Sequence, residues 1–291
     1  MSEVSVRVES KRPAHAATLR VPERTLELLR DLVQARIGMF YDDTRLHFLR
    51  DRITPLALDR GFDSLLDYYY LLKYDAAADA EWIRVIDTLA VQETYFWREA
   101  DQLRALADVI MPALAARRPS EVRIWSLPCA SGEEPLSIAM ALTEAGWYSR
   151  LPIELHASDA SELALTRARA GTYGERAFRQ LPPALKERYS RRTGPAEWTV
   201  DPALLRRVLS WTRVNAVNPG EWPPHAAADV VFCRNLFIYF DGRTVEQVAR
   251  ELSARMRRPG YLCVAAAESL LRLNTPFALE DAGGAFVYVT A

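Results

Sequence analysis

Lysine is nearly absent from this sequence of 291 residues, which contains only Lys11, Lys73 and Lys186. Arginine therefore carries almost all of the positive charge, and its planar guanidinium suits bidentate contact with carboxylates better than an ammonium does. Codon bias produces the same count, and we prefer that explanation. The formal net charge is -1, so no basic field favours nucleic acid and no acidic excess favours a basic partner.

Cysteine and histidine are also scarce, and their spacing excludes the common metal motifs. Cys129, Cys233 and Cys263 lie far apart in apolar runs without a CxxC pair, and the four histidines are scattered. Neither set has the spacing of metal ligands. We expect reduced thiols in the core of a cytoplasmic protein and no bound metal.

Long hydrophobic runs are missing as well. Residues 1–20 are polar and charged, which excludes a signal peptide, and no stretch approaches the roughly 20 apolar residues of a membrane span. With 49% hydrophobic residues the chain can still bury a sizeable core. We expect one large or two modest domains after a mobile tail over residues 1–20, without direct membrane insertion.

The first half of the chain has the period of α-helices. Leu26, Leu29, Val33 and Ile37 recur at helical spacing. Three further helices are predicted: after an acidic cap near residue 42, over residues 65–73, and over residues 82–89. No strand is indicated before residue 121. The sequence therefore predicts an all-α N-terminal domain over residues 21–90.

The second half, residues 91–291, alternates between strands and helices. Such alternation indicates a parallel, Rossmann-like α/β sheet with helices on both faces, which binds ligands at the carboxyl ends of its strands. Residues 171–205 fit the alternation poorly, because three pairs with proline interrupt them, and we expect an inserted element there. The predicted strands cover residues 122–125, 153–158, 208–214, 229–233, 261–266 and 286–289, and the helices residues 133–145, 161–170 and 244–256.

The turn after the first predicted strand, residues 126–135, is made of small residues and ends in Gly132, Glu133 and Glu134. Glycine lets the backbone come close to a ligand, but the turn is neither GxGxxG nor a phosphate loop. Two glutamates repel a phosphate and favour a cationic ligand, such as a sulfonium that bears an amino group. A tight turn with acidic residues favourable to the helix dipole explains the pattern equally well.

Polar residues also follow two other predicted strands. Asp159 stands where an acidic residue accepts both ribose hydroxyls of a nucleoside, although it could simply cap the next helix. The strand at 229–233 ends in Arg234 and Asn235, followed by aromatic residues. Among these, the ring of Tyr239 is suited to a sulfonium through a cation–π contact worth about 0.5–2 kcal/mol.

A dense aromatic patch over residues 91–99 precedes the sheet. Packing between the two halves accounts for Tyr95, Phe96 and Trp97. It does not account for Arg98, which we regard as a candidate functional residue.

Taken in order, these segments resemble the CheR family, the chemotaxis receptor glutamate O-methyltransferases. The resemblance covers nearly the whole chain. Its most specific blocks are Gly-Glu-Glu-Pro at 132–135 and Cys-Arg-Asn followed by Ile-Tyr-Phe-Asp at 233–241. It implies an S-adenosylmethionine (SAM)-dependent methyltransferase domain with a small inserted β-subdomain, preceded by the all-α domain. It also implies S-adenosylhomocysteine as product and no metal.

Site residues follow from the resemblance position by position. It implies that Arg98 and Tyr239 form the reaction centre. The implied cofactor contacts are Thr94, Arg98, Glu133, Asp159, Asn215, Asn235 and Leu236.

The resemblance further implies protein partners. The acceptor would be a glutamate on the cytoplasmic helical coil of a methyl-accepting receptor, docked on the N-terminal helices. Arg45, Arg50 and Arg52 are candidates for that contact, and a solvated helix face explains them equally well. In some family members the inserted subdomain binds a receptor tail peptide.

Departures from the family pattern indicate a divergent branch. Gln92 replaces an asparagine, Pro128 a small residue and Leu136 an aromatic one, and Ala267 lies in a stretch that usually reads Gly-His-Ser-Glu. They leave open a first alternative, a catalytically weak or inactive module that binds SAM or its product. A second alternative is a methyltransferase for a small molecule or nucleic acid. A methyltransferase for nucleic acid is disfavoured, because the chain is neutral and lacks an Asn-Pro-Pro-aromatic motif.

Overall fold

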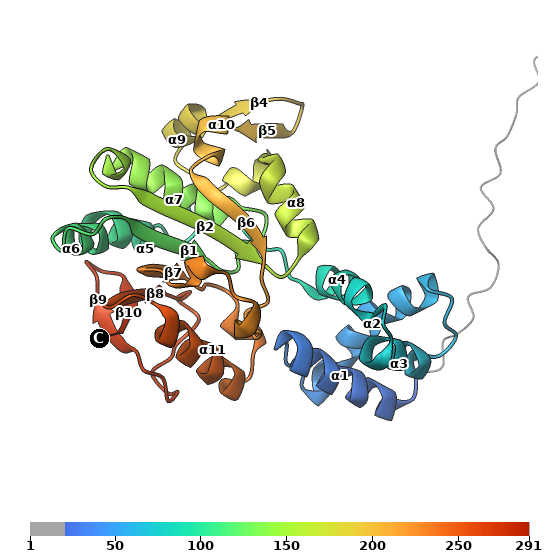
Figure 1. Cartoon of the computed structure of the whole chain (residues 1–291). Helices are drawn as coiled ribbons and strands as arrows, with labels where there is room; N and C mark the ends of the chain where they lie inside the picture. The colour runs from blue at the N-terminus through green and yellow to red at the C-terminus, as the bar shows by residue number, and fades with distance from the viewer. Residues whose placement is uncertain (1–20, 291) are drawn as a thin grey trace, which may run out of the picture.

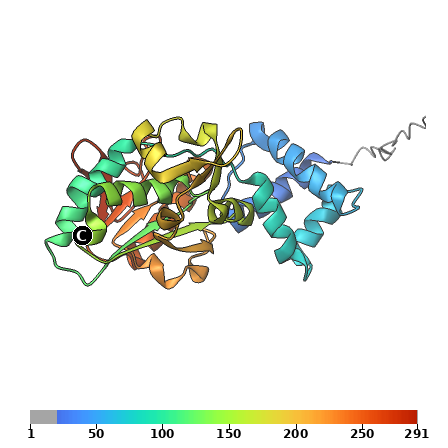
Figure 2. The ribbon, with the colours of Figure 1, turned by 90° about the horizontal axis from the view of Figure 1, so that it is seen from above.

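The computed structural model describes residues 21–290, so the tail expected over residues 1–20 lies outside the described part. Within that part a helical N-terminal portion stands beside a larger α/β portion (Figure 1). Seen from above, the two portions lie end to end (Figure 2). No helix between residues 21 and 290 is both long and apolar enough to cross a membrane.

Four helices make up the N-terminal portion, as the periodicity predicts. Leu29, Val33, Leu49 and Ile53 are fully buried in their common core. α1 ends at Gly38, whose backbone is left-handed with φ of 79°, the usual conformation after a helix. The helices are α1 (Glu23–Ile37), α2 (Leu46–Asp59), α3 (Leu65–Tyr74) and α4 (Ala78–Leu89).

The α/β portion is built on a seven-stranded sheet of order β6-β2-β1-β7-β8-β10-β9. The first five strands are parallel, and β10 pairs antiparallel with both β8 and β9, so the expectation of a parallel sheet is correct for five strands only. The strands are β1 (Val122–Ser126), β2 (Ile153–Asp159), β6 (Val208–Arg213), β7 (Val230–Phe232), β8 (Gly260–Cys263), β9 (Ala278–Asp281) and β10 (Phe286–Thr290).

Helices cover both faces of this sheet. Because side chains alternate along a strand, Ile124 packs into the cluster beneath α7 while Trp125 packs into the cluster beneath α11. The chain runs from β1 outward to β2 and β6, then returns to β7 on the other side of β1. This places a topological switch point between β1 and β7, where ligands bind in such folds. The covering helices are α7 (Glu133–Glu144), α8 (Glu162–Ala170) and α11 (Gly242–Arg255).

The inserted element is a separate three-stranded antiparallel sheet of order β3-β5-β4. The expected architecture, an α/β sheet with a small inserted β-subdomain that follows an all-α portion, is therefore present. The insert comprises β3 (Thr172–Gly174), η4 (Glu175–Phe178), α9 (Pro183–Tyr189), β4 (Ser190–Arg192), β5 (Glu197–Val200) and α10 (Pro202–Leu205).

Sequence reasoning missed a helical segment that lies between α4 and β1 in the chain and packs in the α/β portion (Figure 1). It consists of α5 (Ala100–Ala105), the π-helical turn η2 (Leu106–Ile110) and α6 (Met111–Ala115). Leu103 and Leu114 are buried there, at a helical spacing that was available to find the segment. β9 was also missed, because a short exposed edge strand has no clear apolar pattern.

Candidate functional site

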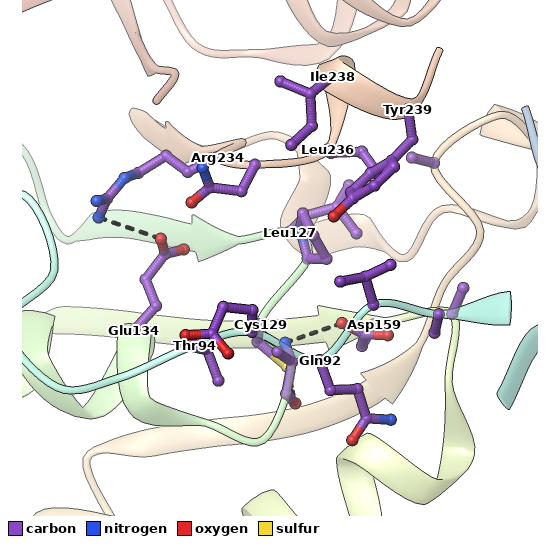
Figure 3. A pocket seen from close by; sticks show the side chains of 18 of the residues that line it. Gln92, Thr94, Leu127, Cys129, Glu134, Asp159, Arg234, Leu236, Ile238 and Tyr239 are labelled. Carbon is purple, nitrogen blue, oxygen red and sulfur yellow. Dashed lines mark hydrogen bonds and ion pairs between the residues drawn. The ribbon is translucent and has the colours of Figure 1, made fainter. Parts of the chain in front are cut away.

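A cavity of about 270 Å³ opens at the switch point. Its wall comes from the ends of β1, β2, β6 and β7, and the helical portion closes it through α1, α4 and the segment that follows α4. Figure 3 shows Leu236, Ile238 and Tyr239 among the side chains that line it, together with Thr94, Cys129 and Asp159. The cavity therefore collects residues from both portions of the chain.

Asp159 ties the end of β2 to the turn after β1. One of its carboxylate oxygens accepts a 2.8 Å hydrogen bond from the backbone N–H of Ala130, and the other accepts one of 2.8 Å from Ser161. Burial raises the pKa of Asp159 to about 6. The side chain that caps α8 is Ser161, so Asp159 is not the helix cap, and it lines the cavity.

Gly132 at the end of the same turn has φ of 99°. A Cβ there would lie 3.0 Å from Ala168 Cβ and 3.0 Å from the hydroxyl of Tyr173. Only glycine combines this backbone conformation with such close packing.

The two glutamates at the start of α7 have different environments. Glu134 lines the cavity and accepts a 2.8 Å hydrogen bond from Ser126, and burial raises its pKa to about 7. Glu133, which the sequence analysis assigned to the cofactor, is not part of the cavity wall, and it accepts a hydrogen bond from Ser131. Successive helical residues point about 100° apart, so only one of the pair faces the cavity.

Arg234 is a buried arginine with several partners, and the sequence analysis named it without assigning it to the site. It is 3% exposed and forms ion pairs with Glu134 at 3.2 Å and with Glu99 at 3.3 Å. It also donates a 2.8 Å hydrogen bond to the backbone carbonyl of Arg98. An arginine at the end of a buried strand was the available signal, since such a charge needs partners.

The segment that carries Arg98 is held in an unusual backbone conformation. Trp97 and Glu99, on either side of Arg98, both have positive φ, 67° and 53°, which is costly for a bulky residue. The N–H of Trp97 donates to Ser137 on α7 at 2.9 Å. The guanidinium of Arg98 donates to the carbonyl of Glu93 at 2.8 Å, and Arg98 lines the cavity with Thr94.

The turn after β7 carries Asn235, Leu236 and Tyr239 to the opposite wall. Glu268 holds this turn by accepting hydrogen bonds from the N–H groups of Asn235 at 2.8 Å and Ile238 at 3.2 Å. The stretch around Ala267 that departs from the family pattern thus retains a carboxylate with a structural role. The ring of Tyr239 faces the cavity (Figure 3).

Asn215 lines the cavity from the end of β6 and also joins the two portions. Its side-chain amide donates a 2.7 Å hydrogen bond to the carbonyl of Arg36 in α1. Arg45, Arg50 and Arg52 are exposed on and beside α2, outside the cavity wall.

The structure brings together seven of the eight assigned site residues and leaves out Glu133. Other residues that line the cavity were not assigned from the sequence. They include Ile37 at the end of α1, Met39 just after it, and Gln92, Cys129, Glu134 and Arg234. Among residues 21–290 no three His, Cys, Asp or Glu side chains gather as metal ligands.

The chemistry of this wall fits SAM. Asp159 offers carboxylate oxygens beside a close-packed turn, as a ribose requires. Glu134 is a buried acid with a raised pKa, and a cationic ammonium group would stabilise its ionised form. Leu236 and Val214 add the apolar surface typical of a ligand pocket.

Two family models match the chain. The model "CheR methyltransferase, all-alpha domain" matches residues 24–90, and "CheR methyltransferase, SAM binding domain" matches residues 92–284.

Curated relatives extend over most of the chain. Chemotaxis protein methyltransferase 2 of Vibrio cholerae is 32% identical over 252 residues, which is 85% of this chain and 86% of that protein. The chemotaxis protein methyltransferase of Borreliella burgdorferi is 28% identical over 258 residues, 87% of this chain and 90% of that protein. A probable biofilm formation methyltransferase, WspC of Pseudomonas aeruginosa, is 35% identical over 226 residues, 77% of this chain and 51% of that protein.

Proposed function

Because the chain belongs to the CheR methyltransferase family, we propose that it methylates glutamate side chains of a chemoreceptor-like signalling protein and forms glutamate methyl esters. The observation that best supports this is the shared cavity. Arg98 and Tyr239 line the same cavity as Asp159 and Glu134, as a reaction centre next to a bound cofactor requires.

The cofactor, when bound, supplies a methyl group on a positively charged sulfur. Asp159 would accept the ribose hydroxyls, and Glu134 would face the ammonium group. Asn215, Asn235 and Thr94 would add polar contacts from three sides. The ring of Tyr239 would flank the sulfonium, with a cation–π contribution of about 0.5–2 kcal/mol.

The acceptor needs no general base. A glutamate has a reference pKa of about 4.3 and is ionised at neutral pH. The residues of the cavity must therefore align one carboxylate oxygen and exclude water. Alignment of this kind supplies roughly 7–11 kcal/mol of barrier reduction.

Arg98 is the residue proposed to steer the acceptor carboxylate, through a charge-assisted contact. Its guanidinium is already shared with the carbonyl of Glu93. This arrangement limits how tightly Arg98 holds the carboxylate, which favours reaction because a strongly bonded carboxylate is a poorer nucleophile.

The acceptor helix is proposed to dock on α2. Arg52 lies on α2 and Arg45 directly precedes it, and both side chains are exposed. Met39, in the segment between α1 and α2, lines the cavity, which connects this region with the cavity. The inserted sheet is proposed as the site for a receptor tail peptide, and receptors of chemotaxis and of other signalling pathways would serve the same chemistry.

The test is base-labile methyl incorporation. The purified protein is mixed with methyl-labelled SAM and membranes of the source organism, and alkali then releases methanol from any carboxyl methyl ester. Volatile label that depends on the protein is the expected result. No label, with S-adenosylhomocysteine binding intact by titration calorimetry, would contradict the proposal and favour a catalytically inactive binding module.

A further inference from the structure

Two arginines from different parts of the chain contact the ring of Tyr95. The guanidinium carbon of Arg179, which follows η4 in the insert, lies 3.7 Å from the ring centroid, and that of Arg98 lies 5.5 Å from it. Tyr95 itself lines the cavity. A single aromatic ring thus connects the inserted subdomain with the residue proposed to steer the acceptor.

Glu93 provides a second connection between the same two arginines. Its carboxylate accepts a 2.7 Å hydrogen bond from Arg179, while its backbone carbonyl accepts the 2.8 Å hydrogen bond from Arg98. The carboxylate also offsets the repulsion between two cations that lie near one ring. Arg179 therefore contacts the same two residues, Tyr95 and Glu93, that the Arg98 guanidinium contacts.

Contacts of the insert hold the backbone next to Arg179 in place. The backbone N–H of Phe96 donates a 2.9 Å hydrogen bond to the carbonyl of Ala177, and the rings of Phe96 and Phe178 stack with centroids 4.9 Å apart. Arg179 also donates to the carbonyl of Arg176 at 3.0 Å. The side chain of Arg179 is 31% exposed, so most of it is packed.

We propose that Arg179 is a positioning residue for Arg98 that acts through Tyr95 and Glu93, so that the inserted subdomain sets the orientation of the reaction centre. This inference rests on the proposed role of Arg98. A planar guanidinium stacked on a ring restricts rotation of that ring, and Tyr95 in turn limits where the Arg98 guanidinium can lie. Misplacement of a steering group by about 1 Å costs up to roughly a hundredfold in rate.

The test compares Arg179→Leu with Arg176→Leu. Arg176 is the matched control, because its side chain is 81% exposed and lies 3.6 Å from the same Glu93 carboxylate. Turnover is measured by base-labile methyl incorporation into membranes of the source organism, and the affinity for S-adenosylhomocysteine by calorimetry. Arg179→Leu is expected to lower kcat by roughly ten- to a hundredfold, with product affinity unchanged, and Arg176→Leu to behave as the unaltered protein.

Substitutions of Tyr95 distinguish the role of its aromatic ring from the role of its hydroxyl. Tyr95→Phe keeps the face and is expected to retain turnover, whereas Tyr95→Leu is expected to lose kcat as Arg179→Leu does. Equal loss in Tyr95→Phe and Tyr95→Leu would overturn the proposed connection, and so would unchanged kcat in Arg179→Leu. Should Arg179→Leu fail to fold, Arg179→Lys, which keeps the charge but lacks the planar guanidinium, takes its place and is expected to lower kcat in the same way.

A double-mutant cycle distinguishes this inference from the proposed function. If Arg179 acts through Arg98, the variant with both Arg98→Ala and Arg179→Leu is no slower than Arg98→Ala alone. Additive losses would show that Arg179 acts elsewhere and would overturn the inference. If Arg98→Ala retains full turnover, the proposed role of Arg98 fails, and with it the inference. If Arg98→Ala loses turnover and Arg179→Leu does not, only the inference fails.

Discussion

The backbone N–H of Phe40 donates a 2.8 Å hydrogen bond to the carbonyl of Tyr239. Beside it, Met39 and Phe240 form an antiparallel bridge. Phe40 follows α1, and Tyr239 is the residue proposed to flank the sulfonium. The helical portion therefore holds the backbone of a residue of the proposed reaction centre directly.

Gly38 makes this contact possible, and its substitution should weaken it. Its φ is 79°, and a Cβ there would lie 2.6 Å from Val217 Cγ1 and 2.8 Å from Phe240 Cε1. We expect Gly38→Ala to lower the free energy of unfolding by more than the roughly 1–2 kcal/mol of a left-handed backbone alone, and to weaken binding of S-adenosylhomocysteine. Urea denaturation and calorimetry measure the two effects.

Gly61 is the matched control for this prediction. Its φ is 81° and nothing lies within 4 Å of the position of a Cβ, so Gly61→Ala should show the backbone cost alone. Equal losses in the two variants would mean that the contact near Tyr239 adjusts without cost.

Glu134 should release a proton when SAM binds. Burial raises its pKa to about 7, and a neighbouring ammonium group favours the ionised form, which lowers that pKa. At pH 7 about half a proton per SAM should leave the protein. Calorimetry in buffers of different ionisation enthalpy measures this release. Glu134→Gln should abolish it and Glu133→Gln should not, and the reverse pattern would return the cofactor contact to Glu133.

Asp159→Ala should weaken binding of S-adenosylhomocysteine by at least roughly tenfold, because hydrogen bonds to a charged group contribute about 1.5–3 kcal/mol. The substitution also removes the acceptor for the N–H of Ala130. Asp159→Asn, which keeps one acceptor oxygen, should lose less. Calorimetry measures the affinity for S-adenosylhomocysteine. An unchanged affinity in Asp159→Ala would exclude this residue from the ribose site.

Charge reversal on α2 should raise the apparent KM for the acceptor and leave product affinity unchanged. Arg45→Glu and Arg52→Glu together reverse the charges at the proposed docking site, and attraction between exposed charges is screened by salt. Arg50→Glu is the control, because Arg50 pairs with Asp51 at 2.9 Å and points about 160° away from Arg52 on α2. The same KM in all variants would indicate a solvated face.

Glu81 should make the helical portion sensitive to acid. It is fully buried and accepts hydrogen bonds from Tyr68 at 2.7 Å and Arg60 at 2.6 Å. Burial acts to raise its pKa, but these bonds and the nearby arginines outweigh burial and lower the pKa below the usual value of 4.5.

A lowered pKa in the folded state means that this stabilisation is complete above pH 4.5 and is lost as the pH falls through the folded-state pKa. Glu81→Gln should cost about 1–3 kcal/mol at pH 7 and flatten the acid side of the stability profile, measured by urea denaturation between pH 3 and pH 7. An unchanged profile would mean that another group controls acid unfolding.

Local patterns alone determined much of the fold. Four buried stripes predicted α1 to α4, because helical spacing reports one buried face. Alternating strands and helices predicted the sheet and its ligand edge, since the carboxyl ends of parallel strands meet there. The antiparallel pairing of β10 with β8 and β9 could not be predicted from such patterns. Strand direction depends on connections and partners far apart in the chain.

Sequence determined which loops carry the candidate site, because polar residues stand at the ends of predicted strands and the family resemblance selects among them. Tertiary structure decided which atoms face the cavity. Glu133 and Glu134 cannot be told apart from the sequence. Both lie at the start of α7, and only Glu134 lines the cavity. Three contacts join segments far apart in the chain: Phe40 with Tyr239, Arg234 with Glu134, and Arg179 with Tyr95. Only the packed fold creates such contacts, because no local periodicity encodes which distant side chains share a burial site.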